Sequence, residues 1–230
     1  MIDVGFQIIC RYNSNRLVGK ILKEIEGKPI LKYIIERLNE VTDLANIVIA
    51  TSSEPSDNPI IEFCQKENIN YFRGSLENVS QRFIECALSK QHIYTTRING
   101  DNIFVDIESL KEMIEIAKMR KYDFVSNLKG RSFPKGMSVE IVRTAYYRKQ
   151  FEKFNHPDHY EHVTLYLYQN EEGENFYYYF NKICPESGGI QLAIDTQEDF
   201  SLATKIISNF AGQHLKYGLE DVFNLYKQLE

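Results

Sequence analysis

The sequence predicts an α/β fold with a mostly parallel central sheet and helices on both of its faces. Short, β-branched apolar segments alternate four times with segments of helical periodicity within about 125 residues, a pattern typical of parallel strands joined by helices. The chain has 230 residues, of which 43% are hydrophobic, so it can fill one core of ordinary domain size. No repeat, low-complexity tract or linker divides it. We therefore expect a single domain over residues 1–230.

The elements of the first half follow from local pattern. Apolar runs predict strands at residues 6–9, 46–51, 71–72, 93–98 and 122–126. Apolar residues at helical spacing predict helices over residues 30–38, from residue 58, over 77–90 and after residue 106. Pro29 suits the first position of the first helix, Asn58 and Pro59 suit the start of the second, and Asp106 suits the cap of the fourth.

The second half has a looser pattern. Residues 130–142 predict a turn and a strand, 144–169 a helical region rich in aromatic residues, and 190–194 a strand that ends at Asp195. Two helices close the chain, the last from about residue 219. The five consecutive aromatic residues at 176–180 favour a sheet or a subunit interface. We expect residues 130–180 to form an acceptor-binding or dimerisation subregion, and the chain to be a homodimer.

Composition excludes several classes of function. The net charge of −5 argues against general nucleic-acid binding, which needs a basic surface. The four cysteines are far apart and show no C-x-x-C spacing, so we expect buried free thiols in a reducing compartment. Residues 1–20 have no apolar segment of signal-peptide length, and no apolar run of 18 residues occurs. We expect a soluble, cytoplasmic protein without a membrane partner.

A basic loop follows the first strand. It carries the cations Arg11, Arg16 and Lys20 among small polar residues, which are Asn13, Ser14, Asn15 and Gly19. Arginine matches phosphate oxygens in pairs, lysine acts as a point charge, and the backbone N–H groups of such a loop can add an anion nest. The loop matches neither the Walker pattern nor G-x-G-x-x-G. A polyphosphate site and a solvated basic turn both remain open from this loop alone.

Two aspartates could hold a metal ion. Asp101 and Asp195 each follow a predicted strand, and the carboxyl ends of the strands in such a sheet share one rim. Mg²⁺ usually takes one or two carboxylates and leaves its other positions to water and phosphate. The alternatives are that Asp101 is a turn residue and that Asp195 caps the helix that begins near Thr196.

Six ordered blocks across residues 6–200 resemble the cytidylyltransferase family that activates acidic sugars. They are similar to its spore-coat polysaccharide branch, which is related to the CMP-sialate and CMP-Kdo synthetases. The blocks are R-x-x-S-x-R-L-x-G-K (11–20), A-T-S (50–52), F-R-G-S-x-x-N-V-x-x-R-F (72–83), R-x-N-G-D-N (97–102), R-S-F-P-K-G-M-S-V-E (131–140) with E-H-V-T-x-Y-x-Y (161–168), and I-D-T-x-E-D-F (194–200). Val18 and Ser138 stand where the family usually has Pro and Asp.

The resemblance implies a three-layer α/β/α fold of the nucleotide-diphospho-sugar transferase (GT-A, Rossmann-like) type. It implies that Asp101 and Asp195 bind Mg²⁺ and, with Arg11 and Lys20, are the catalytic residues. The implied nucleotide-binding residues are Arg11, Ser14, Arg16, Lys20, Ala50, Thr51, Ser52, Arg73, Ser75, Arg82, Asn99 and Gly100. The implied acceptor-binding residues are Arg97, Arg131, Glu140 and His162.

The activity that the resemblance implies is transfer of CMP from CTP to a sugar acid of the 2-keto-3-deoxy type, with release of pyrophosphate, for surface polysaccharide or glycan biosynthesis. Three alternatives remain: a nucleotidyltransferase for a phosphorylated acceptor, a non-catalytic nucleotide-binding protein, and a glycosyltransferase. The last usually has D-x-D after a strand, which Asp101-Asn102-Ile103 does not match.

A cluster of three histidines is a rival metal site. His156, His159 and His162 are spaced by three residues, so they would turn around a helix, and no H-E-x-x-H motif is present. We therefore expect His162 at the acceptor end of the crevice, with His156 and His159 on the surface.

Overall fold

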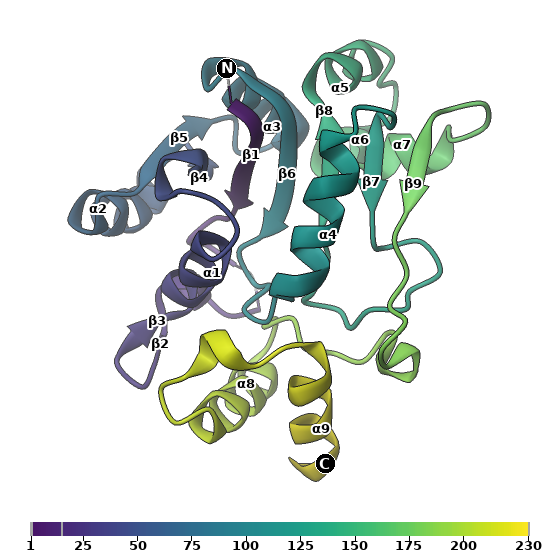
Figure 1. Ribbon diagram of the computed structural model, residues 1–230. Coiled ribbons are helices and arrows are strands. Elements are labelled where there is room, and N and C mark those ends of the chain that lie inside the picture. The colour runs from purple at the N-terminus through teal and green to yellow at the C-terminus, as the bar shows by residue number, and fades with distance from the viewer. Residues whose placement is uncertain (1, 15, 230) are drawn as a thin grey trace.

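The computed structural model describes residues 2–14 and 16–229, and it is built around one seven-stranded sheet (Figure 1). The strand order is β5-β4-β1-β6-β8-β7-β9. Pairing is parallel from β5 to β6 and between β7 and β9, whereas β8 runs antiparallel to both of its neighbours. The strands are β1 (Ile2–Ile9), β4 (Ile47–Ser52), β5 (Asn70–Gly74), β6 (His92–Asn99), β7 (Phe124–Ser126), β8 (Glu140–Arg143) and β9 (Phe176–Tyr178). The predicted mostly parallel sheet is confirmed.

Helices cover both faces of this sheet. The larger core cluster packs α1 (Ile30–Asn39), α2 (Asn58–Glu67) and α4 (Ile107–Lys118) on one face. Two smaller clusters pack α3 (Val79–Ser89), α5 (Thr144–Phe151), α6 (Pro157–Glu161) and α7 (Leu165–Gln169) on the other. All six residues of β4 are buried, as expected for a central strand between two helical layers. The three-layer α/β/α architecture is therefore confirmed.

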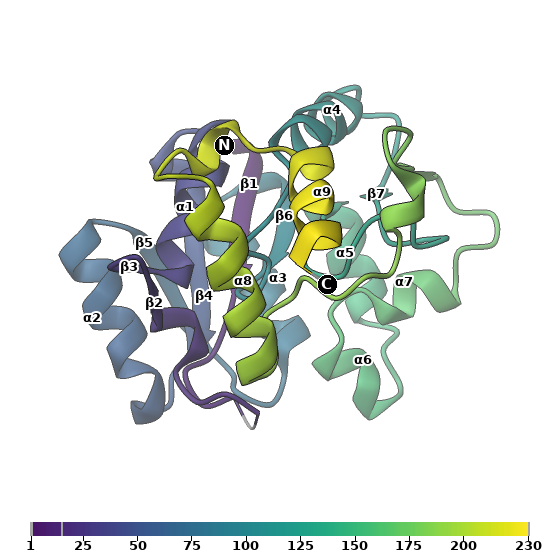
Figure 2. The same cartoon turned by 90° about the horizontal axis from the view of Figure 1, so that it is seen from below.

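The C-terminal helices lie below the ends of the strands. The strands β1 and β6 point toward α8 (Gln197–Asn209) and α9 (Leu219–Leu229), and a view from below shows both helices in front of the sheet (Figures 1 and 2). A short hairpin of β2 (Glu24–Ile25) and β3 (Lys28–Pro29) leads into α1. Arg37 of α1, which is only 1% exposed, donates hydrogen bonds to the carbonyls of Val105, His214 and Tyr217 and so fixes the C-terminal segment to the sheet layer.

Several predicted elements differ in detail. Residues 144–169 form three short helices: α5 ends at Phe151, Pro157 is the first residue of α6, and α7 follows from Leu165. Pro29 precedes α1, and Asp57 occupies the N-cap position of α2. The aromatic run provides β9 at an edge of the sheet, which fits one of its two predicted roles. The four cysteines are buried and free, as expected.

The predicted strand at residues 190–194 is wrong. The segment is extended, but it joins no sheet and forms one isolated bridge, between Gln191 and Lys135. A β-carbon on Gly136 would lie 2.5 Å from the backbone nitrogen of Ala193, so only glycine allows the two segments to approach this closely. No helix among the described residues is long and apolar enough to cross a membrane.

Candidate active site

A cavity of about 330 Å³ lies beyond the carboxyl ends of β1 and β6. This is where a parallel sheet of this kind binds ligands. The cavity brings together five segments that are far apart in the sequence. Its polar lining consists of Arg11, Ser14, Arg16 and Lys20 from the basic loop, Arg82 from α3, Arg97, Asn99, Gly100 and Asp101 at the end of β6, Glu161 and His162 at the end of α6, and Asp195 before α8.

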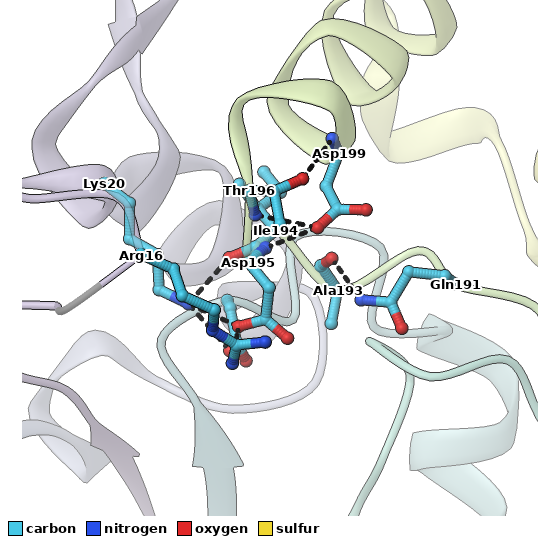
Figure 3. Close-up of polar contacts among 9 residues, drawn as sticks. Arg16, Lys20, Gln191, Ala193, Ile194, Asp195, Thr196 and Asp199 are labelled. Atoms are coloured by element: carbon cyan, nitrogen blue, oxygen red, sulfur yellow. Dashed lines mark hydrogen bonds and ion pairs between the residues drawn. The ribbon is translucent and has the colours of Figure 1, made fainter.

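Lys20 stands between the two predicted metal ligands. Its ammonium nitrogen is 3.1 Å from Asp101 Oδ2 and 3.0 Å from Asp195 Oδ1. It also donates a 2.6 Å hydrogen bond to the carbonyl oxygen of Ile194, and Arg16 Nη2 lies 2.8 Å from the same Asp195 oxygen (Figure 3). Residues separated by 81 and 175 positions therefore meet at one charge cluster.

Local backbone geometry turns the basic loop back on itself. Gly19 has φ of 67°, and its N–H donates a 2.8 Å hydrogen bond to the carbonyl oxygen of Tyr12. A β-carbon at Gly19 would lie only 3.0 Å from the Tyr12 ring. Because glycine adopts this left-handed conformation without strain, the chain can turn directly into Lys20. Asn15, which the sequence placed in this loop, lies outside the described residues.

Asp195 does not cap α8. Thr196 is the N-cap, and it forms a capping box with Asp199. The Asp199 carboxylate also accepts a 2.9 Å hydrogen bond from the backbone N–H of Asp195 (Figure 3). Since Asp199 fixes the backbone, the side chain of Asp195 remains available to the cavity. The sequence alternative in which Asp195 caps this helix is therefore wrong.

The two aspartates fit the donor set of a magnesium site. Asp101 and Asp195 each direct one oxygen at the same cationic nitrogen, and the other oxygen of each has no hydrogen-bond or ion-pair partner among residues 2–14 and 16–229. Two carboxylates with further positions open to water and phosphate are what Mg²⁺ usually takes from a protein. Within the described part of the chain, no cluster of three or more His, Cys, Asp or Glu side chains could hold a metal ion by itself.

Ala50, Thr51 and Ser52, for which the resemblance implies nucleotide contacts, are not among the residues that line this cavity. They are fully buried in β4. The hydroxyl groups of Thr51 and Ser52 both donate to Asp57 Oδ2, and Asp57 Oδ1 accepts a 2.7 Å hydrogen bond from the backbone N–H of Tyr12.

Asp57 is a site residue that sequence reasoning missed. Burial alone would raise its pKa, but the hydrogen bonds from Ser52, Tyr12 and Thr51 together hold the pKa below its usual value. The carboxylate thus ties the end of β4 to the start of the basic loop. Its position just before Asn58-Pro59 indicates a helix start, and no local pattern shows that its carboxylate contacts the basic loop.

The predicted nucleotide-binding residues of the block at 72–83 lie in two different environments. Arg82 lines the cavity, is 3% exposed and donates a 2.7 Å hydrogen bond to the Ser75 carbonyl oxygen. Burial lowers the pKa of its guanidinium. Arg73 instead donates to the carbonyls of Ser52 and Glu54, and the Ser75 hydroxyl accepts from the N–H of Asn78. Arg73 and Ser75 therefore stabilise the walls and do not line the cavity.

The predicted acceptor residues are also divided. Arg97 and His162 line the cavity, whereas Glu140 is buried behind it and forms an ion pair with Arg97. Arg131 is exposed, has φ of 41° and is not among the residues that line the cavity. His159 is buried and contacts Gln169 Oε1 at 2.8 Å, so its predicted surface position is wrong.

The fold and the cavity define a nucleotidyltransferase. The chain matches the Cytidylyltransferase family over residues 7–228 and belongs to that family. Among curated proteins it is 30% identical to the uncharacterized protein MJ1063 of Methanocaldococcus jannaschii, over 88% of this chain and 82% of that one. It is 28% identical to the spore coat polysaccharide biosynthesis protein SpsF of Bacillus subtilis, over 98% and 94% of the two chains.

Solved structures agree with this assignment. A cytidylyltransferase from Leptospira borgpetersenii superposes with a TM-score of 0.91 at 28% identity, covering 99% of this chain and 95% of that chain. The CMP:2-keto-3-deoxy-manno-octonic acid synthetase, solved in complex with CTP, has a TM-score of 0.67 at 14% identity, covering 90% and 99% of the two chains, so it supports the fold alone.

Proposed function

We propose that this enzyme transfers CMP from CTP to a sugar acid of the 2-keto-3-deoxy type, with Mg²⁺ as cofactor and release of pyrophosphate. The observation that carries the proposal is the convergence of Asp101 and Asp195 on Lys20, in a cavity that four arginines also line. Transfer of a nucleotidyl group from a triphosphate needs positive charge of this kind around the phosphates and at the pyrophosphate leaving group. The family assignment and the names of SpsF and the CTP-complexed synthetase support cytidine and a sugar acceptor.

The transfer step needs an in-line displacement at the α-phosphorus. The acceptor hydroxyl oxygen forms a bond to this phosphorus, and the bond to the oxygen that bridges to the β-phosphate breaks, its electron pair leaving with pyrophosphate. The hydroxyl proton passes to water. Arg11, Arg16 and Arg82 bind the phosphates and stabilise the charge that builds up on the leaving group. Lys20 orients the Asp101 and Asp195 carboxylates until nucleotide binds.

Asp101 and Asp195 would hold the magnesium ion. When bound, Mg²⁺ supplies positive charge to the phosphate oxygens and lowers the cost of their close approach. Arg97 and His162 would contact the acceptor, since both line the cavity. The product would serve surface polysaccharide or glycan biosynthesis, the process named for SpsF.

Pyrophosphate release tests the proposal. The four nucleoside triphosphates are each assayed with Mg²⁺ against 2-keto-3-deoxy sugar acids and sugar 1-phosphates. We expect release with CTP and a sugar acid, and a loss of about 10²-fold or more in Asp101→Asn. We expect wild-type rates in Asp43→Asn, because Asp43 is an exposed aspartate that lies before β4 and outside the cavity lining. Release only with phosphorylated acceptors would show that the substrate is a sugar phosphate and not a sugar acid. Nucleotide binding without release would favour a non-catalytic role.

We further propose that the enzyme is a homodimer that pairs through the edge of the sheet near β9. Phe180 and Ile183, which follow this strand, are 45% and 64% exposed. Large apolar side chains of this kind are typical of subunit interfaces. Light scattering at micromolar concentration is expected to give twice the monomer mass for the wild type and for Leu88→Asp, a control at 44% exposure elsewhere, and the monomer mass for Phe180→Asp. A monomeric wild type would contradict the proposal.

A further inference from the structure

The turn between α6 and α7 brings Glu161 and His162 into the cavity lining. Both residues are exposed, and neither side chain has a hydrogen-bond or ion-pair partner within residues 2–14 and 16–229. The resemblance implies an acceptor contact for His162 and gives no role to Glu161. Because their side chains have no partner in the described part of the protein, both are free to contact a ligand in the cavity.

The helices on either side are too short to hold this turn by themselves. The helices α6 and α7 have five residues each, whereas an isolated helix of fewer than about 12–15 residues is at best marginally stable in water. Between them, His162 has φ of −99° and ψ of 89°, which is not a helical conformation. Contacts with other parts of the fold must therefore set the direction in which Glu161 and His162 point.

Two buried hydroxyl groups anchor the backbone on either side of this pair. Ser80 Oγ, in α3, donates a 2.6 Å hydrogen bond to the carbonyl oxygen of His159. Tyr147 OH, in α5, donates a 2.7 Å hydrogen bond to the carbonyl oxygen of Val163. Ser80 and Tyr147 are both fully buried. The two residues that line the cavity lie between the anchored carbonyls, so both ends of the turn are fixed.

The anchors also join the turn to the rest of the cavity wall. Ser80 lies in sequence between Val79 and Arg82, which both line the cavity, so one helix supports Arg82 and the α6 segment together. The ring of Tyr147 packs edge-on against Phe83 of the same helix, with centroids 5.1 Å apart. Because both hydroxyls are shielded from water, losing a carbonyl partner would leave a buried polar group unsatisfied. The turn is therefore held firmly against α3 and α5.

We propose that Ser80 and Tyr147 are positioning residues that hold Glu161 and His162 in contact with the sugar acceptor. A carboxylate accepts hydrogen bonds and a neutral imidazole both donates and accepts them, so this pair suits the hydroxyl groups of a sugar. The anchors act through the backbone and do not touch the substrate. This inference rests on the proposed transfer to a sugar acceptor, and it adds Glu161 as an acceptor contact.

Deleting each hydroxyl tests the proposal. Ser80→Ala and Tyr147→Phe each remove one hydrogen bond, and the second keeps the aromatic ring in its packing. The acceptors are the 2-keto-3-deoxy sugar acids and sugar 1-phosphates of the pyrophosphate-release assay. We expect kcat/KM for the acceptor to fall about tenfold in each variant, since a displacement of about 1 Å can cost roughly 100-fold, and the KM for CTP to stay the same. Each variant carries the test if the other does not fold, and calorimetric titration of the acceptor reports the change without turnover.

Two matched variants make the same chemical changes elsewhere. Tyr33→Phe removes a hydroxyl that donates a 2.9 Å hydrogen bond to the Ile25 carbonyl oxygen. Ser89→Ala, in the same helix as Ser80, removes a hydroxyl that donates at 2.9 Å to the carbonyl oxygen of Cys86. Neither Tyr33 nor Ser89 lines the cavity. We expect wild-type kinetics for both substrates in these controls.

A double-mutant cycle shows whether the anchors act through the turn. In Glu161→Ala/His162→Ala the acceptor contacts are already lost, so adding Tyr147→Phe should lower kcat/KM for the acceptor by less than about twofold further. A purely structural role would instead lower kcat/KM by the same factor in both backgrounds.

The outcomes separate this inference from the proposed function. Unchanged acceptor kinetics in both hydroxyl variants, or equal losses in both backgrounds of the cycle, would overturn the inference and leave the proposed function standing. A wild type that uses only sugar 1-phosphates would contradict the sugar-acid substrate, and a tenfold loss with those acceptors would still support the inference. A wild type that binds CTP but no acceptor of either class would overturn both.

Discussion

Replacing Lys20 with methionine tests the charge cluster at the centre of the site. The change keeps the length of the side chain and removes the ammonium that contacts both carboxylates and the Ile194 carbonyl oxygen. Asp101 and Asp195 would then face each other, and only Arg16 would remain bound to one of them. We expect both stability and turnover to fall. We expect Mg²⁺ to stabilise the variant more than it stabilises the wild type.

The structure sets the magnitudes. The side chains of Lys20, Asp101 and Asp195 are 12%, 21% and 22% exposed, so solvent screens the contacts only in part. Hydrogen bonds to charged groups contribute about 1.5–3 kcal/mol each, and because both aspartates can regain water in the variant, we expect a net loss of about 2–3 kcal/mol. For a chain of this length, that corresponds to a fall of about 5 °C in the thermal midpoint. Turnover should fall by about 10²–10³-fold.

Magnesium should partly restore the stability of Lys20→Met without nucleotide. In the wild type the ammonium already satisfies both carboxylates, whereas in the variant they are open to a cation. At ten times its dissociation constant, an ion that binds only the folded state adds about 1.4 kcal/mol. Thermal unfolding is therefore followed during a Mg²⁺ titration, with Lys32→Met as the control because Lys32 pairs with Glu67 away from the cavity. Equal Mg²⁺ shifts in wild type and variant, or a rate loss below tenfold, would refute this reasoning.

Three further predictions concern residues outside the charge cluster. Asp57→Asn should destabilise the protein by about 2–3 kcal/mol at pH 7, because it replaces a buried, hydrogen-bonded carboxylate, and it should lower turnover by loosening the loop at Tyr12. The pKa of Asp57 is lowered in the folded state, so the wild type loses this contribution as pH falls below about 4. Denaturation curves of the two proteins should therefore converge at that pH. Burial lowers the pKa of His92 to about 4 from an unfolded value of 6.5. Between these two pH values the unfolded state binds one more proton than the folded state, so the free energy of unfolding falls as pH decreases. Urea denaturation should show that the free energy lost between pH 7 and pH 5 is about 2 kcal/mol smaller in His92→Gln than in the wild type, and an equal loss would contradict the assignment. A β-carbon at Gly100 would lie 2.6 Å from the Cys10 β-carbon, so Gly100→Ala should lower kcat by displacing the turn before the metal site, and Cys10→Gly in the same chain should restore part of it; no recovery would argue against this contact as the cause.

Local pattern was sufficient for most of the scaffold. The strands before residue 126 and the helices between them follow from apolar periodicity, because each is stabilised by burying one face against the same sheet. The position of the basic loop beside Asp101 was predictable for a similar reason: residues at the carboxyl ends of parallel strands share one rim of the sheet. In the second half, short elements pack on several neighbours at once, so periodicity alone could not separate α5, α6 and α7 or exclude a strand at 190–194.

The sequence alone established an α/β fold class, with cationic residues after β1 and carboxylates after β6 and before α8. The type of each charged residue and its place in the chain can be read directly from the sequence. Only the tertiary structure decided what those groups contact. Lys20 meets Asp195 across 175 positions, Thr196 and not Asp195 caps α8, and Glu140 is enclosed behind Arg97 where a substrate contact was expected. Burial and hydrogen-bond partners depend on segments that are distant in the chain, so no local pattern contains them.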